Sequence, residues 1–212
     1  MKYKLVIFDF DGTLMDTSEG IYDCGKRAMS AVGLKIPENA NWKEFIGPPL
    51  SDCFRFAFFI NDDETLQNLC FEYRKLYSTE GYKKACFYPG IRELLFRLKR
   101  EGYKIAVASM KGIDLIEKMN DYYGISCIMD CCMGQTPDDN TVDKKTLLDR
   151  LCSSFDVSRS ECIMIGDTYY DADGAKLVGM DCIKVNFGFG FTPEDEGTVS
   201  TADEIYRIIT ER

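Results

Sequence analysis

The sequence predicts an α/β fold with a doubly wound parallel sheet and an inserted α-helical domain. Short apolar runs recur along the chain, and the segments between them are long enough to hold a helix. Two of these segments carry apolar residues at helical spacing. The gap between the first two runs is too long for one strand-to-strand connection. These features are typical of buried parallel strands joined by crossover helices, with an insertion after the first strand.

The expected strands are five apolar runs of three or four residues each. They are residues 5–8, 105–108, 127–129, 162–165 and 182–185. Periodicity alone does not separate such short runs from buried helix segments. The segments between the runs favour strands, because two of these segments have their apolar residues on one helical face and so are expected to be the helices that join the strands. The apolar residues are Ile91, Leu94, Leu95 and Leu98 in one segment and Leu147, Leu148 and Leu151 in the other.

Residues 15–85 are expected to form the inserted helical domain, and residues 1–14 and 86–212 the sheet domain. The interior of the insertion shows no strand-like alternation of apolar and polar residues. After the insertion, Pro89 and Gly90 open the helix that leads back into the sheet domain. Proline is well placed there, because the first turn of a helix does not need its missing N–H.

Composition argues against several classes of partner. The formal net charge is −9, so the molecule repels nucleic acid and anionic membrane surfaces, and neither is an expected partner. The N-terminal apolar run is too short for a secretory signal, and no run reaches membrane-spanning length. Ten cysteines without such a signal indicate reduced thiols and a cytoplasmic protein. Both a monomer and a homodimer remain open.

The sequence contains no histidine, which excludes Ser-His and Cys-His mechanisms. Any catalysis must then use carboxylates, lysines and a metal ion. A zinc site was considered at Cys127, Cys131 and Cys132, which cluster in the sequence. Their spacing does not match the usual zinc knuckles, so buried thiols are the preferred interpretation.

Polar residues end three of the expected strands: Asp9 and Ser109 come directly after theirs, and Asp167 comes after one glycine. In an open parallel sheet the carboxyl ends of the strands share one edge, where ligands bind. These three side chains should therefore converge there. Asp11 and Asp171 follow two of the strands closely and would bring the number of carboxylates at this edge to four.

Four carboxylates in one crevice would be partly protonated unless a cation neutralised them. Magnesium is the expected cation, because its octahedral oxygen coordination suits aspartates, a backbone carbonyl, waters and a phosphate oxygen. Gly12 would let the backbone turn sharply and approach that phosphate.

The same residues resemble the haloacid dehalogenase superfamily. Residues 9–17 read DFDGTLMDT, Ser109 follows a strand, and residues 166–171 read GDTYYD. Residues 45–50 (FIGPPL) and 87–90 (FYPG) extend the resemblance over nearly the whole chain. The phosphoglycolate phosphatase-like branch, which has a Rossmann-like core and a helical cap, fits best.

The resemblance implies a magnesium-dependent phosphatase that acts on small phosphorylated metabolites. Asp9 would be the nucleophile that forms an aspartyl-phosphate, and Asp11 the general acid and then base. Magnesium would be held by the carboxylates of Asp9 and Asp167 and by the backbone carbonyl of Asp11. Ser109 and Lys144 would bind the transferring phosphoryl oxygens.

Two wider sets of site residues follow from the resemblance. The phosphate-binding set is Asp9, Phe10, Asp11, Ser109, Met110 and Lys144. The supporting set is Gly12, Thr13, Gly166 and Asp171.

The chain departs from the pattern of this branch at two places. Met110 and Lys111 follow Ser109, where the branch often has asparagine first. Residues 134–145 lack the usual Gly-Lys-Pro, so the phosphate-binding lysine must be chosen between Lys144 and Lys145. Lys144 is preferred, because it opens the helix expected toward Leu147.

Three other functions compete with a phosphatase. A dehalogenase would need neither Asp11 nor Asp167. A phosphomutase of the β-phosphoglucomutase type shares the whole core, and a non-catalytic binding module could share the fold. The substrate is left open, with Lys43 and Arg55 as candidate contacts to a second anionic group.

Overall fold

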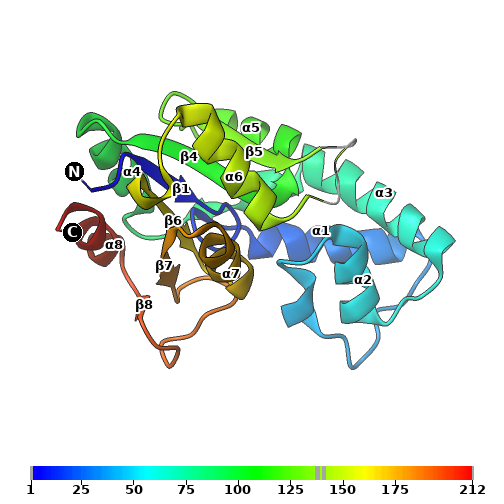
Figure 1. Ribbon diagram of the computed structural model, residues 1–212. Helices are drawn as coiled ribbons and strands as arrows, with labels where there is room; N and C mark the ends of the chain where they lie inside the picture. The colour runs from blue at the N-terminus through cyan, green and yellow to red at the C-terminus, as the bar shows by residue number, and fades with distance from the viewer. Residues whose placement is uncertain (1, 137–138, 140–141, 212) are drawn as a thin grey trace. The chain divides into compact units, whose positions relative to one another are not determined.

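The computed structural model describes residues 2–136, 139 and 142–211, without the side chains of residues 43 and 44. The chain folds into two compact units, one of Met1–Asp16 with Phe87–Arg212 and one of Thr17–Cys86. Figure 1 shows the elements of each unit. The boundaries expected from the sequence, after residues 14 and 85, lie within two residues of these positions.

The first unit is built on a six-stranded parallel sheet with the strand order β5-β4-β1-β6-β7-β8. From β1 the chain passes to β4 and β5, and then returns to the other side of β1 at β6. The sheet is therefore doubly wound, as predicted, with its switch point beside β1. The strands are β1 (Leu5–Phe8), β4 (Lys104–Gly112), β5 (Cys131–Gln135), β6 (Cys162–Gly166), β7 (Asp181–Val185) and β8 (Thr198–Val199). Two short strands, β2 (Met15–Asp16) and β3 (Cys86–Phe87), form a separate sheet.

Helices flank the six-stranded sheet. All four residues of β1 are fully buried, so both faces of this central strand are covered. On one face, α6 and α7 pack in a cluster that includes Leu5, Ile7 and Leu148. The helices of this unit are α4 (Ile91–Arg100), α5 (Ile113–Tyr122), α6 (Lys144–Phe155), the short η3 (Arg159–Glu161), α7 (Tyr169–Val178) and α8 (Ala202–Thr210). The predicted apolar faces of α4 and α6 are buried.

One expected strand is wrong: residues 127–129 form no strand, and β5 begins at Cys131. The segment after α5 packs through Ile125 and Ile128, which are buried and three residues apart, a spacing that fits a turn. Asp130 then starts the pairing, since its backbone N–H donates to the Ile105 carbonyl at 2.8 Å. All of β5 is half-buried, as an edge strand is. Its apolar residues 131–133 form a run no longer than residues 127–129, so run length alone does not identify which of the two is the strand.

The second unit is helical. Its elements are α1 (Ser18–Ala31), η1 (Trp42–Phe45), α2 (Leu50–Phe58), α3 (Asp63–Thr79) and η2 (Gly81–Lys84). Aromatic rings form its centre, where Phe45 lies 5.0 Å from Phe54 and 5.1 Å from Phe58 between ring centroids. Phe56 and Phe59, which lie in the same segment of the chain as Phe54 and Phe58, are exposed.

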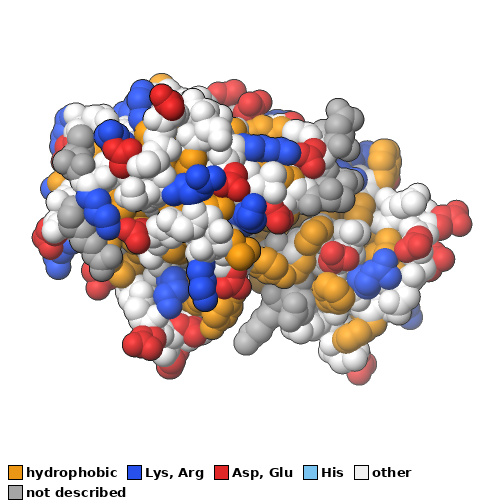
Figure 2. Space-filling view, viewed as in Figure 1, with side chains coloured by type: hydrophobic (Ala, Val, Ile, Leu, Met, Phe, Trp, Pro, Cys, Tyr) orange, Lys and Arg blue, Asp and Glu red, His pale blue; other side chains and the backbone are white. Residues whose placement is uncertain are grey.

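Within the described residues, no helix combines the length and the apolar character needed to cross a membrane. Figure 2 shows Lys and Arg side chains lying among Asp and Glu side chains on the visible face. Several of the surface charges are paired, as in the contacts that Asp149 makes with Lys145 and Arg159.

Candidate active site

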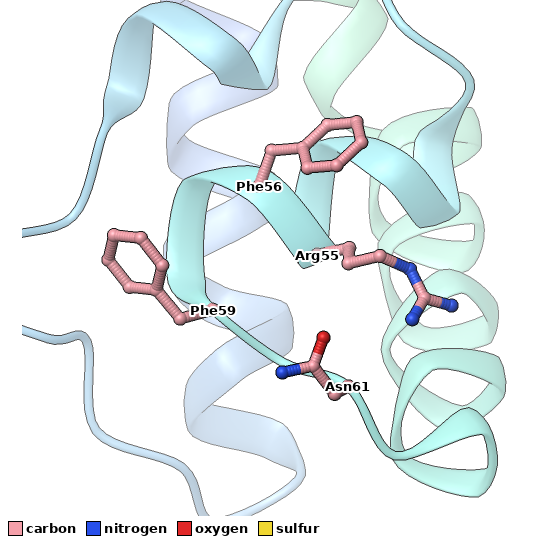
Figure 3. Close-up of a pocket in the computed structure, with 4 residues that line it drawn as sticks. All are labelled: Arg55, Phe56, Phe59 and Asn61. Atoms are coloured by element: carbon pink, nitrogen blue, oxygen red, sulfur yellow. The ribbon is translucent and has the colours of Figure 1, made fainter.

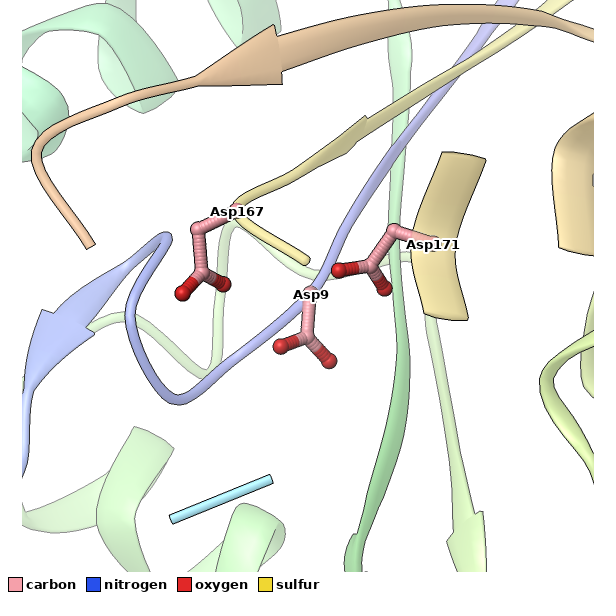
Figure 4. Close-up of side chains that lie close together, drawn as sticks. All are labelled: Asp9, Asp167 and Asp171. Carbon is pink, nitrogen blue, oxygen red and sulfur yellow. The ribbon is translucent and has the colours of Figure 1, made fainter. Parts of the chain in front are cut away.

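Three buried aspartates lie together at the carboxyl edge of the sheet in the first unit. Asp9 follows β1, Asp167 follows β6, and Asp171 lies in the first turn of α7. One carboxylate oxygen from each lies within 4.8 Å of the others, and Figure 4 shows the three side chains side by side. The strand ends therefore bring Asp9 and Asp167 together, although they are far apart in the sequence.

Lys144 lies among these acids with only 6% of its surface exposed. Its ammonium lies 2.8 Å from Asp9 Oδ1 and 2.7 Å from Asp171 Oδ1, and it donates to the Ala108 carbonyl at 2.7 Å. Lys145, the next residue, is exposed and pairs with Asp149 one helical turn away. The geometry thus brings Lys144, and not Lys145, to the aspartates.

Asp171 supports Lys144 and caps its own helix. Its Oδ2 accepts hydrogen bonds from the backbone N–H and the hydroxyl of Thr168, which together form a capping box at the start of α7. Since Oδ1 contacts Lys144, both oxygens are engaged. Asp171 is therefore better suited to orient the lysine than to bind a metal ion.

Asp167 is fully buried and held from two sides. The Thr13 hydroxyl donates to its Oδ1 at 3.0 Å, and the Phe189 N–H donates to its Oδ2 at 2.7 Å. Both approaches depend on glycine: a Cβ atom on Gly12 would lie 2.2 Å from Asp167 Oδ2, and one on Gly188 would lie 2.4 Å from it. Gly12 also has φ of +87°, so the expected sharp turn is present.

Burial makes the charges of these acids costly. It raises the pKa of Asp9 from 3.8 to about 6, although the charge of Lys144 opposes the shift. Burial, and then the neighbouring charge of Asp9, raise the pKa of Asp167 from 3.8 to about 7. Burial disfavours the charged form of Lys144, but Asp171 and Asp9 outweigh it and raise the pKa of the lysine.

The second aspartate of the first motif, Asp11, pairs with another lysine. The Lys111 ammonium lies 3.0 Å from Asp11 Oδ1 and 3.2 Å from Oδ2. When all are ionised, the four carboxylates of Asp9, Asp11, Asp167 and Asp171 and the two ammoniums of Lys111 and Lys144 give the site a net charge of −2.

The donor set fits a divalent cation. Two uncompensated charges on buried carboxylates match the charge of Mg²⁺, and oxygen ligands are those that it prefers. Asp9 and Asp167 each keep lone pairs that no described hydrogen bond uses. With the backbone carbonyl of Asp11, they are the residues that would hold the ion.

The remaining predicted site residues lie at the same edge. Ser109 is buried inside β4 and not after it, because β4 continues to Gly112 with a shift of register after Ala108. Phe10 is fully buried beside Asp9, and Gly166 ends β6. Met110 packs against the cluster of α6 and α7.

A family model described as haloacid dehalogenase-like hydrolase matches residues 6–185, which include every residue of this site except the Phe189 and Gly188 contacts. The chain belongs to the haloacid dehalogenase-like hydrolase family. The resemblance read from the motifs is therefore confirmed, and so is the expectation of a hydrolase.

Individual relatives show the extent of the similarity. A 5'-nucleotidase from Pseudomonas aeruginosa is 31% identical over 92% of this chain and 87% of its own. The tyrosine-protein kinase PtkA from Mycobacterium tuberculosis is 29% identical, and the chain spans 63% of its length. A phosphoglycolate phosphatase from Psychrobacter arcticus is 24% identical over 90% of this chain and 86% of its own. The crystal structure of a predicted phosphatase from Clostridium acetobutylicum has a TM-score of 0.87 at 27% identity and covers 100% of both chains.

Sequence reasoning missed two parts of this haloacid dehalogenase-like site. Lys111 was noted only as a departure from the family pattern, although residues two apart in a strand point to the same side and Ser109 was already a candidate. The Phe189 donor was not considered. Its signal is the alternation of glycine in residues 186–190 (NFGFG) just after β7, which allows a close backbone approach.

The second unit has a surface hollow of about 600 Å³ on α2 and the turn after it. Its lining residues are Arg55, Phe56, Phe59 and Asn61 (Figure 3). Arg55, a candidate for contacting an anionic group, lies 3.3 Å from Asp63. The other candidate, Lys43, has a side chain outside the described residues.

Proposed function

We propose that the protein is a magnesium-dependent phosphatase that hydrolyses small phosphate monoesters through an aspartyl-phosphate on Asp9. One observation carries the proposal: buried Asp9 and Asp167 converge with Lys144, and the site keeps two uncompensated negative charges. That is the charge pattern of a site that binds a divalent cation together with a phosphate. Two relatives, named 5'-nucleotidase and phosphoglycolate phosphatase, support the same chemistry.

The residues divide the reaction into two displacements. An Asp9 oxygen attacks phosphorus while Asp11 gives a proton to the leaving oxygen. Asp11 then takes a proton from the water that attacks the aspartyl-phosphate. Lys144 and Ser109 bind the phosphoryl oxygens, whose negative charge spreads in the transition state. Bound magnesium would supply further charge stabilisation for those oxygens.

The first test is hydrolysis of p-nitrophenyl phosphate with magnesium and with a chelator. We expect magnesium-dependent release of p-nitrophenol that Asp9→Asn abolishes, because an amide is not a competent nucleophile. Asp203→Asn, at an exposed carboxylate on α8, is the matched control and should keep wild-type activity. Equal activity in Asp9→Asn and wild type would refute the nucleophile.

The substrate class is tested with a panel of phosphate esters. It includes nucleoside 5'-monophosphates and phosphoglycolate, because relatives carry the corresponding names. Isomerisation of a sugar phosphate in place of phosphate release would favour the phosphomutase. No turnover of any ester, with intact folding, would favour a binding module. We also expect the protein to act in the cytoplasm, as a monomer or homodimer.

A further inference from the structure

An ion pair joins Asp11, a reacting residue, to Lys111, which takes part in none of the steps above. Both oxygens of Asp11 contact the same ammonium, at 3.0 and 3.2 Å. The Lys111 side chain is 7% exposed and the Asp11 side chain 20% exposed, so the pair is largely shielded from water. Such a pair is held more firmly than a surface ion pair.

The strand β4 determines where Lys111 lies. β4 continues past Ser109 to Gly112, and its register with β5 shifts between Ala108 and Gly112. The Lys111 N–H lies 3.4 Å from the Ser109 hydroxyl oxygen. Its ammonium lies 5.8 Å from the centre of the Phe10 ring, next to Asp11 in the chain. The lysine therefore approaches Asp11 from the strand that also carries Ser109.

To act as general acid and base, the Asp11 carboxylate needs a contact that fixes its direction. It follows β1 in a turn, and an unrestrained aspartate side chain can rotate about two bonds. A general acid or base works only within hydrogen-bond reach of its proton partner, and small displacements are costly. Two contacts to one ammonium restrict the direction of the carboxylate.

We propose that Lys111 is a positioning residue that holds the Asp11 carboxylate toward the ester oxygen of the substrate. This inference rests on the proposed function. It separates the two lysines of the site: Lys144 contacts Asp9 and Asp171, whereas Lys111 contacts Asp11. Loss of Lys111 should therefore damage proton transfer at the leaving group, and loss of Lys144 should damage phosphoryl transfer with any leaving group.

The test compares two substrates of similar shape, phenyl phosphate and p-nitrophenyl phosphate. Phenolate leaves poorly without a proton, whereas p-nitrophenolate leaves readily. In Lys111→Met we expect kcat/KM, which reports the steps up to loss of the leaving group, to fall at least about threefold more on phenyl phosphate than on p-nitrophenyl phosphate, because general acid catalysis serves the poorer leaving group. Lys111→Arg, which can also donate twice to one carboxylate, should recover most of the loss.

Lys104→Met is the matched control. Lys104 lies on the same strand at its opposite end, where it is 3.1 Å from Asp130, and its loss should leave the ratio of the two kcat/KM values unchanged. Lys111→Gln keeps a polar group at the shielded position and must show the same selective loss if Lys111→Met does not fold.

Three results would overturn the inference. They are an equal fall of kcat/KM on both esters, no fall on either, or a fall that comes from a higher KM with kcat unchanged, which would make Lys111 a substrate-binding residue. Failure of the wild type to hydrolyse either ester would instead refute the proposed function, and the inference with it.

Discussion

At the scale of single residues, substitutions of the neighbouring residues Lys144 and Lys145 should have very different effects. Lys144→Met would leave Asp9 and Asp171 buried without their cation, which destabilises a fold strongly. We expect kcat/KM for p-nitrophenyl phosphate to fall by about a hundredfold or more, as when a group that stabilises transition-state charge is removed. Lys145→Met should stay close to wild type, because an exposed pair on a helix contributes about 0.3–0.5 kcal/mol. The reverse order of effects in the kinetics and thermal melts would mean that the wrong lysine was chosen.

The two raised carboxylate pKa values predict how magnesium binding depends on pH. The pKa of Asp9 is about 6 and that of Asp167 about 7, so both bind protons as the pH falls through this range. The ion needs the ionised forms. Magnesium affinity should therefore rise with pH across this window, and binding should release protons. Calorimetry in buffers of different ionisation enthalpy measures both the affinity and the number of protons released.

The same shifts set the stability of the metal-free protein. Both pKa values are raised above 3.8, so these groups contribute stability at acid pH that is lost as the pH rises through about 6 and about 7. Magnesium should thus raise the thermal midpoint more at about pH 8 than at about pH 5, because only ionised carboxylates bind it. An equal rise at both pH values would show that the ion does not bind these carboxylates.

Residue types and strand ends predicted that Asp9, Asp11 and Asp167 lie at one edge of the sheet, and the resemblance to the family led to Lys144. The support of these residues was not found, because it comes from backbone approach and side-chain packing. The Phe189 N–H reaches Asp167 only where Gly188 lets the two segments come close. Such a contact depends on the folded path of a loop, which sequence periodicity does not describe.

At the scale of elements, α6 connects the core to the site, since it begins at Lys144 and buries Leu148 completely. Leu148→Ala should lower the free energy of unfolding by about 2–5 kcal/mol, through lost burial and a cavity. Ser153→Ala, at an exposed position of the same helix, should change it by less than about 0.5 kcal/mol. Denaturant unfolding of both variants measures this. Similar effects of the two would contradict the packing of α6 on the sheet.

The prediction of elements succeeded where an apolar run is fully buried and failed at the edges of the sheet. β1 and β6 are buried on both faces, and their runs were located correctly. β5 is half-buried and its apolar run is no longer than the run at residues 127–129, which is not a strand, and β8 has only two residues. Edge strands have one free side, which weakens the hydrophobic pattern that sequence reasoning uses.

At the scale of the whole molecule, the α/β class with its helical insertion followed from the lengths of the runs and gaps. The substrate did not. Substrate specificity depends on which side chains contact the bound ester. The sequence shows that residue 55 is an arginine, but it does not show where the side chain of Arg55 points. The panel of phosphate esters is therefore the route to specificity.

The central claim is that Asp9 takes the phosphoryl group before water does, and the stereochemistry at phosphorus tests it most directly. Each in-line displacement inverts the phosphorus centre, so two displacements restore it. Hydrolysis of a p-nitrophenyl phosphorothioate whose two non-bridging oxygens are different isotopes, in water of the third isotope, should give chiral inorganic thiophosphate with retained configuration. Inverted thiophosphate would mean that water attacks the ester directly, and that Asp9 is not the nucleophile.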